Sequence, residues 1–278
     1  MTQRQLPRRS PFAFGLTFIP PETLGAFAAE ADGPGRTLAA AAAHLRAAFA
    51  FVPSWEPWAG EALSALVDAG ISAFWAVEGP LWPVLASEGI IEGLRRTLTH
   101  PDEMADRIEF GLDAVVARAR HGLESGASAI VLAEDLAGAQ GPLVAPDFAI
   151  ERLLPAYEAV VAVANDFSLP AVLHSDGDTR WMLGAVKRAG FAAMHAGGGL
   201  DFDAFERLFW AARVHDLAII GGMQTVDLSR GLARAEVLGS RIGLLARAGG
   251  LLVADDGGVT ELQQVASLVD AVSAARAV

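Results

Sequence analysis

Eight short apolar segments alternate along the chain with longer amphipathic segments. Short apolar runs of this kind are typical of buried strands. Strands that alternate with helices pair in parallel and are covered on both faces. The predicted strands are Pro11–Phe18, Phe49–Pro53, Ser72–Val77, Ser128–Leu132, Pro170–Leu173, Ala192–Met194, Leu217–Ile220 and Leu251–Val253.

The amphipathic segments have the periodicity of helices that pack on a sheet, as Glu56–Asp68 illustrates. An insertion with short helices of its own is expected between Gly79 and Pro101. The other predicted helices are Thr37–Ala48, Asp102–Glu124, Phe148–Asn165, Thr179–Arg188, Phe202–Val214, Leu228–Ala248 and Glu261–Ala275. Eight such units predict an α/β fold, a single (β/α)8 TIM barrel. The alternative, an open doubly wound sheet, would carry Gly-x-Gly-x-x-Gly after its first strand, and that motif is absent.

The length of 278 residues suits one barrel, which typically takes about 250 residues. We therefore expect a single domain over residues 1–278, with residues 1–10 as an N-terminal tail. No apolar run reaches the roughly 18 residues that a membrane span needs. Because Met1-Thr2-Gln3-Arg4 leads into no apolar signal region, we expect a soluble, cytoplasmic protein with no membrane partner.

Composition restricts the chemistry. The chain has no cysteine, which excludes thiolate catalysis and thiolate metal ligands. A metal would have to be held by imidazole, carboxylate or water. The net charge of −12 argues against nucleic acid as a partner, because a phosphate backbone needs a basic surface. Nothing in the composition fixes the oligomeric state.

Ionisable residues follow several of the predicted strands, and in a barrel these strand ends meet at one mouth. His174 and Asp176 are two residues apart, so both can face the mouth while Ser175 faces away. This spacing excludes a local Ser-His-Asp triad and favours an acid/base pair or a divalent metal site. The alternative is a hydrogen-bonded histidine and a helix-capping aspartate, although Asp178 is better placed for capping.

Two further acidic pairs end predicted strands. Asp255 and Asp256 would repel each other and raise one pKa unless a cation or a donor lies between them. They suit a metal ligand and a proton carrier, or alternatively a turn that leads into the last helix. Glu134 and Asp135 pose the same choice, and only one of the two can point inward.

Other residues near the mouth are candidates for substrate contact. Glu78 ends the third strand, and His195 precedes Gly197-Gly198-Gly199, a stretch that would suit an anion or a turn into the next helix. Four tryptophans that lie close together in the sequence indicate a pocket wall for a flat or apolar ligand, or core packing. They are Trp55, Trp58, Trp75 and Trp82. We expect Trp55 and Trp75 to contact substrate together with Glu78, His195, Glu134 and Asp135.

Several segments in the second part of the chain follow one another in a characteristic order. They are Gly126-Ala127-Ser128, Glu134-Asp135-Leu136-Ala137-Gly138-Ala139-Gln140-Gly141-Pro142, Leu154-Pro155-Ala156-Tyr157, His174-Ser175-Asp176-Gly177, Gly221-Gly222-Met223 and Asp256-Gly257-Gly258. From about Thr97 onward the sequence resembles the uroporphyrinogen decarboxylase superfamily, which includes cobalamin- and coenzyme-M-linked methyltransferases. The resemblance implies the same barrel fold.

The sequence departs from the decarboxylases of that superfamily. Their N-terminal Arg-Gln-Ala-Gly-Arg signature is not reproduced by Arg4-Gln5-Leu6-Pro7. Their aspartate after the second strand is missing from Phe51-Val52-Pro53-Ser54-Trp55. An acidic pocket would also repel a polycarboxylate tetrapyrrole. These departures disfavour porphyrinogen decarboxylation.

The methyltransferases bind zinc through a His-x-Cys pair and a later cysteine. Here His174 keeps the histidine position, Asp176 replaces the first cysteine, and Asp255 or Asp256 lies near the second. The resemblance therefore implies a divalent metal such as zinc, held by His174, Asp176 and Asp255, and a corrinoid carried on a partner protein. Oxygen ligands make a harder site, which favours an oxygen-containing substrate or a different metal.

The leading hypothesis is an enzyme that transfers a methyl group between a small-molecule substrate and a corrinoid protein. His174, Asp176 and Asp256 would be catalytic, and Glu134 or Asp135 would orient the substrate. One alternative is a lyase that decarboxylates a small carboxylated compound or a tetrapyrrole, with His174 as proton donor. Another is a barrel that binds a tetrapyrrole or corrinoid without catalysis.

Overall fold

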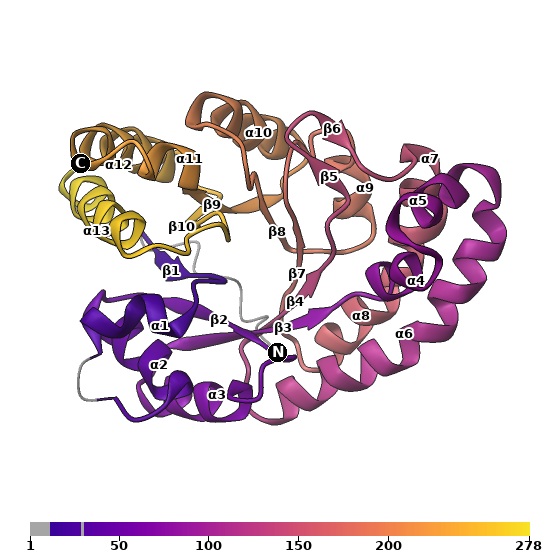
Figure 1. Cartoon of the computed structure of the whole chain (residues 1–278), viewed down its shortest axis with the longest axis horizontal. Coiled ribbons are helices and arrows are strands. Elements are labelled where there is room, and N and C mark those ends of the chain that lie inside the picture. The colour runs from indigo at the N-terminus through magenta and orange to yellow at the C-terminus, as the bar shows by residue number, and fades with distance from the viewer. Residues whose placement is uncertain (1–11, 29–30) are drawn as a thin grey trace.

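The computed structural model describes residues 12–28 and 31–278, and its central feature is a closed barrel of eight parallel strands (Figure 1). The strand order around the barrel is β1-β10-β9-β8-β7-β4-β3-β2, which confirms the predicted TIM barrel. The strands are β1 (Phe14–Leu16), β2 (Phe49–Pro53), β3 (Ser72–Glu78), β4 (Ala129–Ala133), β7 (Ala171–Ser175), β8 (Ala193–Ala196), β9 (Ala218–Met223) and β10 (Leu251–Asp255). The expected tail, residues 1–10, lies outside the described residues.

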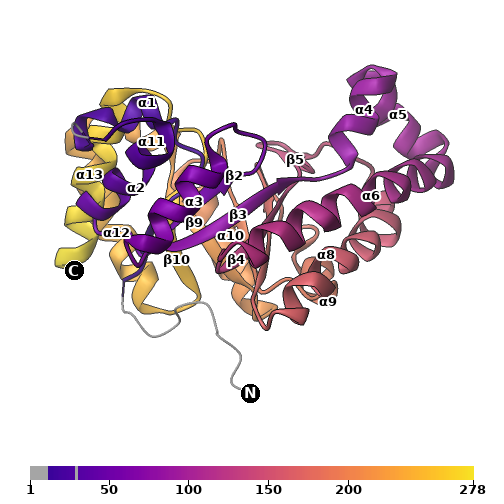
Figure 2. The same cartoon turned by 90° about the horizontal axis from the view of Figure 1, so that it is seen from below.

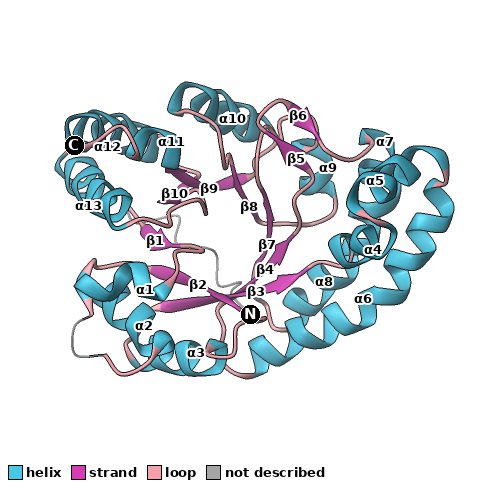
Figure 3. Cartoon of the chain, in the orientation of Figure 1, coloured by secondary structure: helices cyan, strands magenta, loops and turns pink. Residues whose placement is uncertain are grey.

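Helices surround the barrel (Figure 3). They are α1 (Pro21–Leu24), the 3-10 turn η1 (Gly25–Phe27), α2 (Pro34–His44), α3 (Ala59–Asp68), α4 (Leu81–Glu88), α5 (Ile90–Thr99), α6 (Pro101–Glu124), α7 (Pro146–Phe148), the π-helical turn η2 (Ala149–Leu153), α8 (Leu154–Asp166), α9 (Leu183–Arg188), α10 (Phe202–Val214), α11 (Thr225–Leu228), α12 (Leu232–Arg247) and α13 (Leu262–Ala277). None of these helices has the length and apolar character needed to cross a membrane.

Two local predictions need correction. The single helix expected over Leu228–Ala248 is broken into α11 and α12, because Gly231 adopts a φ of 91° that a helix does not allow. A small antiparallel hairpin, β5 (Ala137–Gly138) with β6 (Gly141–Pro142), follows β4 and was not predicted.

The barrel interior is filled unevenly. Phe49, Phe51 and Phe74 occupy the side formed by β2 and β3, where the rings of Phe49 and Phe74 stack at 4.8 Å. Small side chains on the other strands leave room for them, since TIM barrels fill their interior with layers of side chains. These small residues are Ala129, Ala193, Ala218 and Ala254. On β1, Gly15 pairs with Phe49 and completes the fit.

Replacing Gly15 by alanine is expected to destabilise the protein by about 2 kcal/mol, because the added Cβ would lie 2.3 Å from the Phe49 ring. Urea unfolding measures the change. Gly60→Ala in α3 is the control, since a Cβ added there would meet no atom within 4 Å and helix propensity favours alanine. The double variant Gly15→Ala with Phe49→Leu should recover part of the loss; equal stability of Gly15→Ala and the native chain would contradict this packing.

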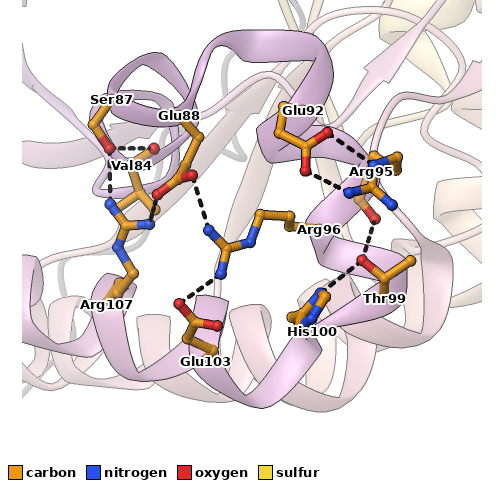
Figure 4. A network of polar contacts seen from close by, with 10 residues as sticks. All are labelled: Val84, Ser87, Glu88, Glu92, Arg95, Arg96, Thr99, His100, Glu103 and Arg107. Carbon is orange, nitrogen blue, oxygen red and sulfur yellow. Dashed lines mark hydrogen bonds and ion pairs between the residues drawn. The ribbon is translucent and has the colours of Figure 1, made fainter.

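The predicted insertion forms α4 and α5, which project beside α6 at one end of the molecule (Figure 2). A network of ion pairs holds this corner together (Figure 4). Arg96 contacts Glu88 at 2.8 Å and Glu103 at 2.6 Å, and Arg107 also pairs with Glu88. Arg96 therefore links α5 to both α4 and α6.

We expect Arg96→Ala to speed protease cleavage within residues 81–99 severalfold while the barrel unfolds as before, because the variant removes the two ion pairs that join α5 to α4 and to α6. Arg95→Ala is the matched control, since Arg95 pairs with Glu92 inside α5. Hydrogen bonds from Arg107 and Arg96 lower the pKa of Glu88, so acid should loosen the same corner once Glu88 protonates. Equal cleavage of the two variants would show that the network does not fasten the insertion.

Candidate metal and substrate site

The carboxyl ends of the strands open onto a pocket of about 660 Å³, lined mainly by residues at or after the ends of β1, β2, β3, β4, β7 and β10. This is the end of a TIM barrel at which active sites are found. At the base of the pocket, His174 at the end of β7 lies beside Asp135, which follows β4. The site therefore joins residues that are far apart in sequence.

His174, Asp135 and Asp176 form a group whose potential ligand atoms all lie within 4.8 Å of one another. The Nε2 atom of His174 is 3.6 Å from Oδ1 of Asp135 and 4.0 Å from Oδ1 of Asp176. The same Oδ1 atom of Asp135 accepts the backbone N–H of Asp176 at 3.0 Å. This bond connects the loops after β4 and β7 and holds the two carboxyl groups on the same side of the imidazole.

A chain of hydrogen bonds fixes the tautomer of His174. Nε2 of His195 lies 3.1 Å from the carbonyl oxygen of Asp255, and a carbonyl can only accept. Neutral His195 therefore carries its proton on Nε2 and accepts at Nδ1 from Nδ1 of His174, 2.7 Å away. The remaining nitrogen of His174, Nε2, is left with a lone pair, which lies beside Asp135 and Asp176.

The surroundings keep both imidazoles neutral. Burial lowers the pKa of His174 well below its usual value, and the neighbouring His195 adds to the effect. Burial also lowers the pKa of His195. Aromatic rings provide the apolar environment: Phe18 lies 5.0 Å from His174, and Phe51 lies 5.2 Å from His195. A lone pair facing two carboxyl groups is stable only if a cation or a proton lies between them.

Asp176 has a raised pKa of about 7, caused first by burial and then by the charges of Asp135 and Asp256. At neutral pH its carboxyl group is therefore close to half protonated. A divalent cation would displace that proton, since a carboxylate ligand must be deprotonated.

Comparison with protein families shows which family the chain belongs to. The family model for uroporphyrinogen decarboxylase (URO-D) matches residues 84–237, which is more than half of the chain. The chain belongs to the uroporphyrinogen decarboxylase family. The match covers β4, β7 and β8, the strands that carry Asp135, His174 and His195. At the sequence level, no curated protein matches.

Several solved structures share the barrel fold of this chain. A methyltransferase from Methanosarcina mazei has a TM-score of 0.60 and 16% identity; the match covers 78% of this chain and 63% of the methyltransferase. A D-psicose 3-epimerase crystallised with D-fructose has a TM-score of 0.52 and 13% identity; the match covers 96% of this chain and 99% of the epimerase. An intracellular xylanase from Thermoanaerobacterium saccharolyticum has a TM-score of 0.51 and 10% identity; the match covers 90% of this chain and 86% of the xylanase. At these identities the likeness establishes the fold alone.

Asp255 and Asp256 lie outside this metal-ligand group. Asp255 accepts the backbone N–H of Thr17 at 2.9 Å and of Gly257 at 3.0 Å, and also bonds the Thr17 hydroxyl. Burial raises its pKa to about 6. Asp256 bonds Thr225 through both backbone and hydroxyl and accepts from a glycine amide. Both carboxyl groups bond loop residues, and the group of potential metal ligands contains Asp135 where Asp255 was predicted, while the catalytic role of Asp256 stays a prediction.

Glu134 and Asp135 separate as the alternation of a strand requires. Glu134 turns away from the metal-ligand group and accepts the hydroxyl of Tyr157 and the backbone N–H of Leu81 at the start of α4. Burial raises the pKa of Glu134 to about 8, and burial raises that of Tyr157 as well. Its other oxygen, Oε1, is buried without a partner, and Glu134 still lines the pocket.

The remaining predicted residues divide into two groups. Trp55 and Glu78 line the pocket. Trp75 does not: its side chain packs outward against α6, where its Nε1 donates to the carbonyl of Arg118, so its predicted substrate contact is wrong. Its position in β3 explains this, since alternate residues of a strand face opposite sides. His195 is completely buried behind His174 and positions that ring rather than touching substrate.

Sequence reasoning missed three contributors. Thr17 and Phe18 follow β1 and Tyr157 lies in α8, and each contacts a partner from another element: Asp255, His174 and Glu134 respectively. Only Tyr157 gave a signal, as part of the family-like segment Leu154-Pro155-Ala156-Tyr157. Phe18 looked like the apolar end of a strand, although it forms the pocket wall beside His174.

Proposed function

We propose that this member of the uroporphyrinogen decarboxylase family is a metal-dependent methyltransferase. It would move a methyl group between a small-molecule substrate and a corrinoid carried by a partner protein. The observation that supports this proposal best is the lone pair of His174 Nε2 beside Asp135 and Asp176. A methyltransferase with the same fold at a TM-score of 0.60 agrees with it.

The donor atoms suit a divalent ion such as zinc. Two ligands of a tetrahedral zinc site, each about 2.1 Å from the ion, lie roughly 3.4 Å apart. The separations of 3.6 and 4.0 Å from His174 Nε2 are slightly larger, so a small inward movement of Asp135 and Asp176 would complete three ligands. In this place a divalent ion would supply Lewis-acid polarisation of a substrate heteroatom.

The residues of the chain itself would have distinct roles. His195 would hold the His174 ring in the tautomer that presents Nε2, as the outer hydrogen-bond partner of a metal-ligating histidine commonly does. Phe18 and Phe51 would exclude water from the imidazole pair. Glu134 would fix the start of α4 and the direction of Asp135.

The decarboxylase alternative receives less support. A carboxylated substrate needs cationic partners, and no lysine or arginine is among the described residues that line the pocket. The arginine-rich network of Figure 4 belongs to the insertion and is already paired with glutamates. Purely non-catalytic binding would leave the tautomer of His174 without a function.

The proposal is tested first by metal content. The protein is equilibrated with zinc, freed of excess and analysed for bound metal, and one ion per chain is expected. The loaded protein is then mixed with reduced cobalamin and, in turn, methanol, dimethyl sulfide or tetramethylammonium as methyl donor. Absorbance changes of the cobalamin that disappear on chelation would support methyl transfer. A protein that retains no zinc, or that releases carbon dioxide from a carboxylated probe without metal, would overturn the proposal.

A further inference from the structure

The wall of the pocket above the metal-ligand group carries acidic side chains from four segments of the chain, at or after the ends of β1, β2, β3 and β4. Glu22, Glu56 and Glu78 line it together with Glu134 and Asp135. No lysine or arginine is among its described lining residues. A divalent ion would offset two carboxylates at the base, and the acidic groups higher in the pocket would still have no counter-ion among the described residues.

Aromatic side chains make up much of the remaining wall. Phe18 lies between the metal-ligand group and the upper wall: its ring is 5.0 Å from His174 and stacks on Trp55 at 6.0 Å. Trp58 and Trp82 also line the pocket. Within the described residues, arginine side chains lie over the rings of Phe12, Phe14, Phe167 and Phe202, none of which lines the pocket. No arginine of the described residues therefore lies over a pocket ring.

One buried atom points independently to a ligand. Glu134 is 1% exposed, yet its Oε1 atom has no hydrogen-bond partner while the residue lines the pocket. A buried carboxyl oxygen without a partner is costly, and native structures normally satisfy it. A cation in the pocket would offer this oxygen an electrostatic partner in place of a hydrogen-bond donor.

We propose that the pocket binds a small methylated onium cation, a quaternary ammonium or a tertiary sulfonium. Its methyl groups would lie against Phe18, Trp55 and Trp58, and Glu56 and Glu78 would balance its charge. Aromatic rings attract such cations through their negative faces, and enclosure by several rings is a common way of recognising them. The inference rests on the proposed function in taking this pocket as the substrate site.

Onium ions are also chemically suited to methyl transfer. When a methyl group leaves, the electron pair of the broken bond stays on nitrogen or sulfur, which departs as a neutral amine or sulfide. The acceptor of the proposed function, the reduced corrinoid, supplies the electron pair for the new bond to carbon. The ligand therefore loses its positive charge in the reaction, and the acidic aromatic pocket binds the donor more tightly than the product.

A neutral sugar is the competing occupant, because aromatic rings and carboxylates also bind sugars. Sugar hydroxyls need hydrogen-bond donors and acceptors in similar number. The carboxyl groups of this pocket are mostly acceptors, and apart from the indole N–H groups of the three tryptophans the described lining offers one hydroxyl, that of Thr17, which already donates to Asp255. A pocket with many acceptors and few hydrogen-bond donors suits a cation better than a sugar.

Calorimetric titration with choline and with 3,3-dimethylbutan-1-ol tests the inference directly, since these molecules differ in shape only by the exchange of nitrogen for carbon. The titrations are made at 150 mM salt, where the Debye length is about 8 Å, so that the general negative charge of the protein is screened. We expect choline to bind at least tenfold more tightly than the neutral alcohol. Tetramethylammonium and trimethylsulfonium then show which onium is preferred. Equal affinity for choline and the alcohol, or binding of D-fructose alone, would overturn the inference.

Variants locate the binding. Trp55→Ala and Glu78→Gln should each weaken choline binding fivefold or more. Trp210→Ala on α10 is a matched control, because Trp210 and Trp55 are both 48% exposed. Glu124→Gln at the end of α6 controls for the lost charge. If the control variants weaken binding as much as the pocket variants, the ligand is held by general charge and the inference fails.

The two proposals fail separately. Choline binding requires neither metal nor corrinoid, so it can be measured on metal-free and zinc-loaded protein alike. Zinc binding with methyl transfer from neutral donors, but no choline binding, would overturn the onium inference and leave the proposed function intact. Choline binding by a protein that retains no zinc would overturn the proposed function and leave the onium inference intact.

Discussion

Replacing His174 by alanine is expected to remove zinc binding, lowering the affinity roughly a thousandfold or more, which exceeds the 10- to 100-fold typical of outer-shell partners. The variant loses the one nitrogen ligand of the group and leaves Asp135 and Asp176 facing each other. Competition with a chromophoric chelator at pH 8 measures the affinity. His44→Ala, at the exposed end of α2, is the control and should bind zinc as the native chain does. Unchanged zinc affinity in His174→Ala would place the metal elsewhere.

His195→Phe tests the hydrogen-bond chain behind the same ligand. Phenylalanine preserves the aromatic contact with Phe51 but cannot accept the proton of His174 Nδ1. We expect zinc affinity to fall roughly 10- to 100-fold while the fold is kept. An affinity equal to that of the native protein would show that His174 finds its tautomer without this partner.

Asp176→Asn is expected to have opposite effects on metal binding and on stability. Burial raises the pKa of Asp176 to about 7, above the value of about 3.9 for an unfolded chain. The folded state therefore holds a proton that the unfolded state releases, and metal-free stability falls as pH rises from about 4 to about 7. Asparagine does not titrate, so the variant escapes this loss. Because the Asp176 side chain is 47% exposed, we expect a gain of only about 1 kcal/mol at pH 8 and none at pH 4.

The zinc affinity of the native chain should also depend on the protonation of Asp176. Unlike the metal-free stability, it should rise with pH. Because zinc must displace the proton of Asp176, affinity should rise about tenfold per pH unit below pH 7 and level off above it. Asp176→Asn should bind zinc weakly at every pH. Asp178→Asn is the control: Asp178 is paired with Arg180, which lowers its pKa, so its loss should not stabilise the protein. A flat pH profile in the native chain would exclude Asp176 as a ligand.

The order and type of the elements were readable from the sequence. Eight apolar runs gave eight strands, with Phe49–Pro53 and Phe202–Val214 predicted to the residue. Strand and helix leave different periods in the placement of apolar residues, so this information is local. The candidate residues His174, Asp176 and Asp135 were found for a related reason: parallel strands in a barrel all end at the same mouth.

Only the tertiary structure decided which of these residues work together. The two members of each acidic pair look alike in sequence, yet Asp135 joins His174 while Glu134 bonds Tyr157, and Asp255 is fastened to Thr17, 238 residues away. A carboxyl group takes its role from its hydrogen-bond partners, and here those partners come from other strands. The sequence determined the barrel and the residues at its mouth; packing between distant strands decided which of those residues lie together, because burial and partners are properties of the closed barrel and not of any single segment.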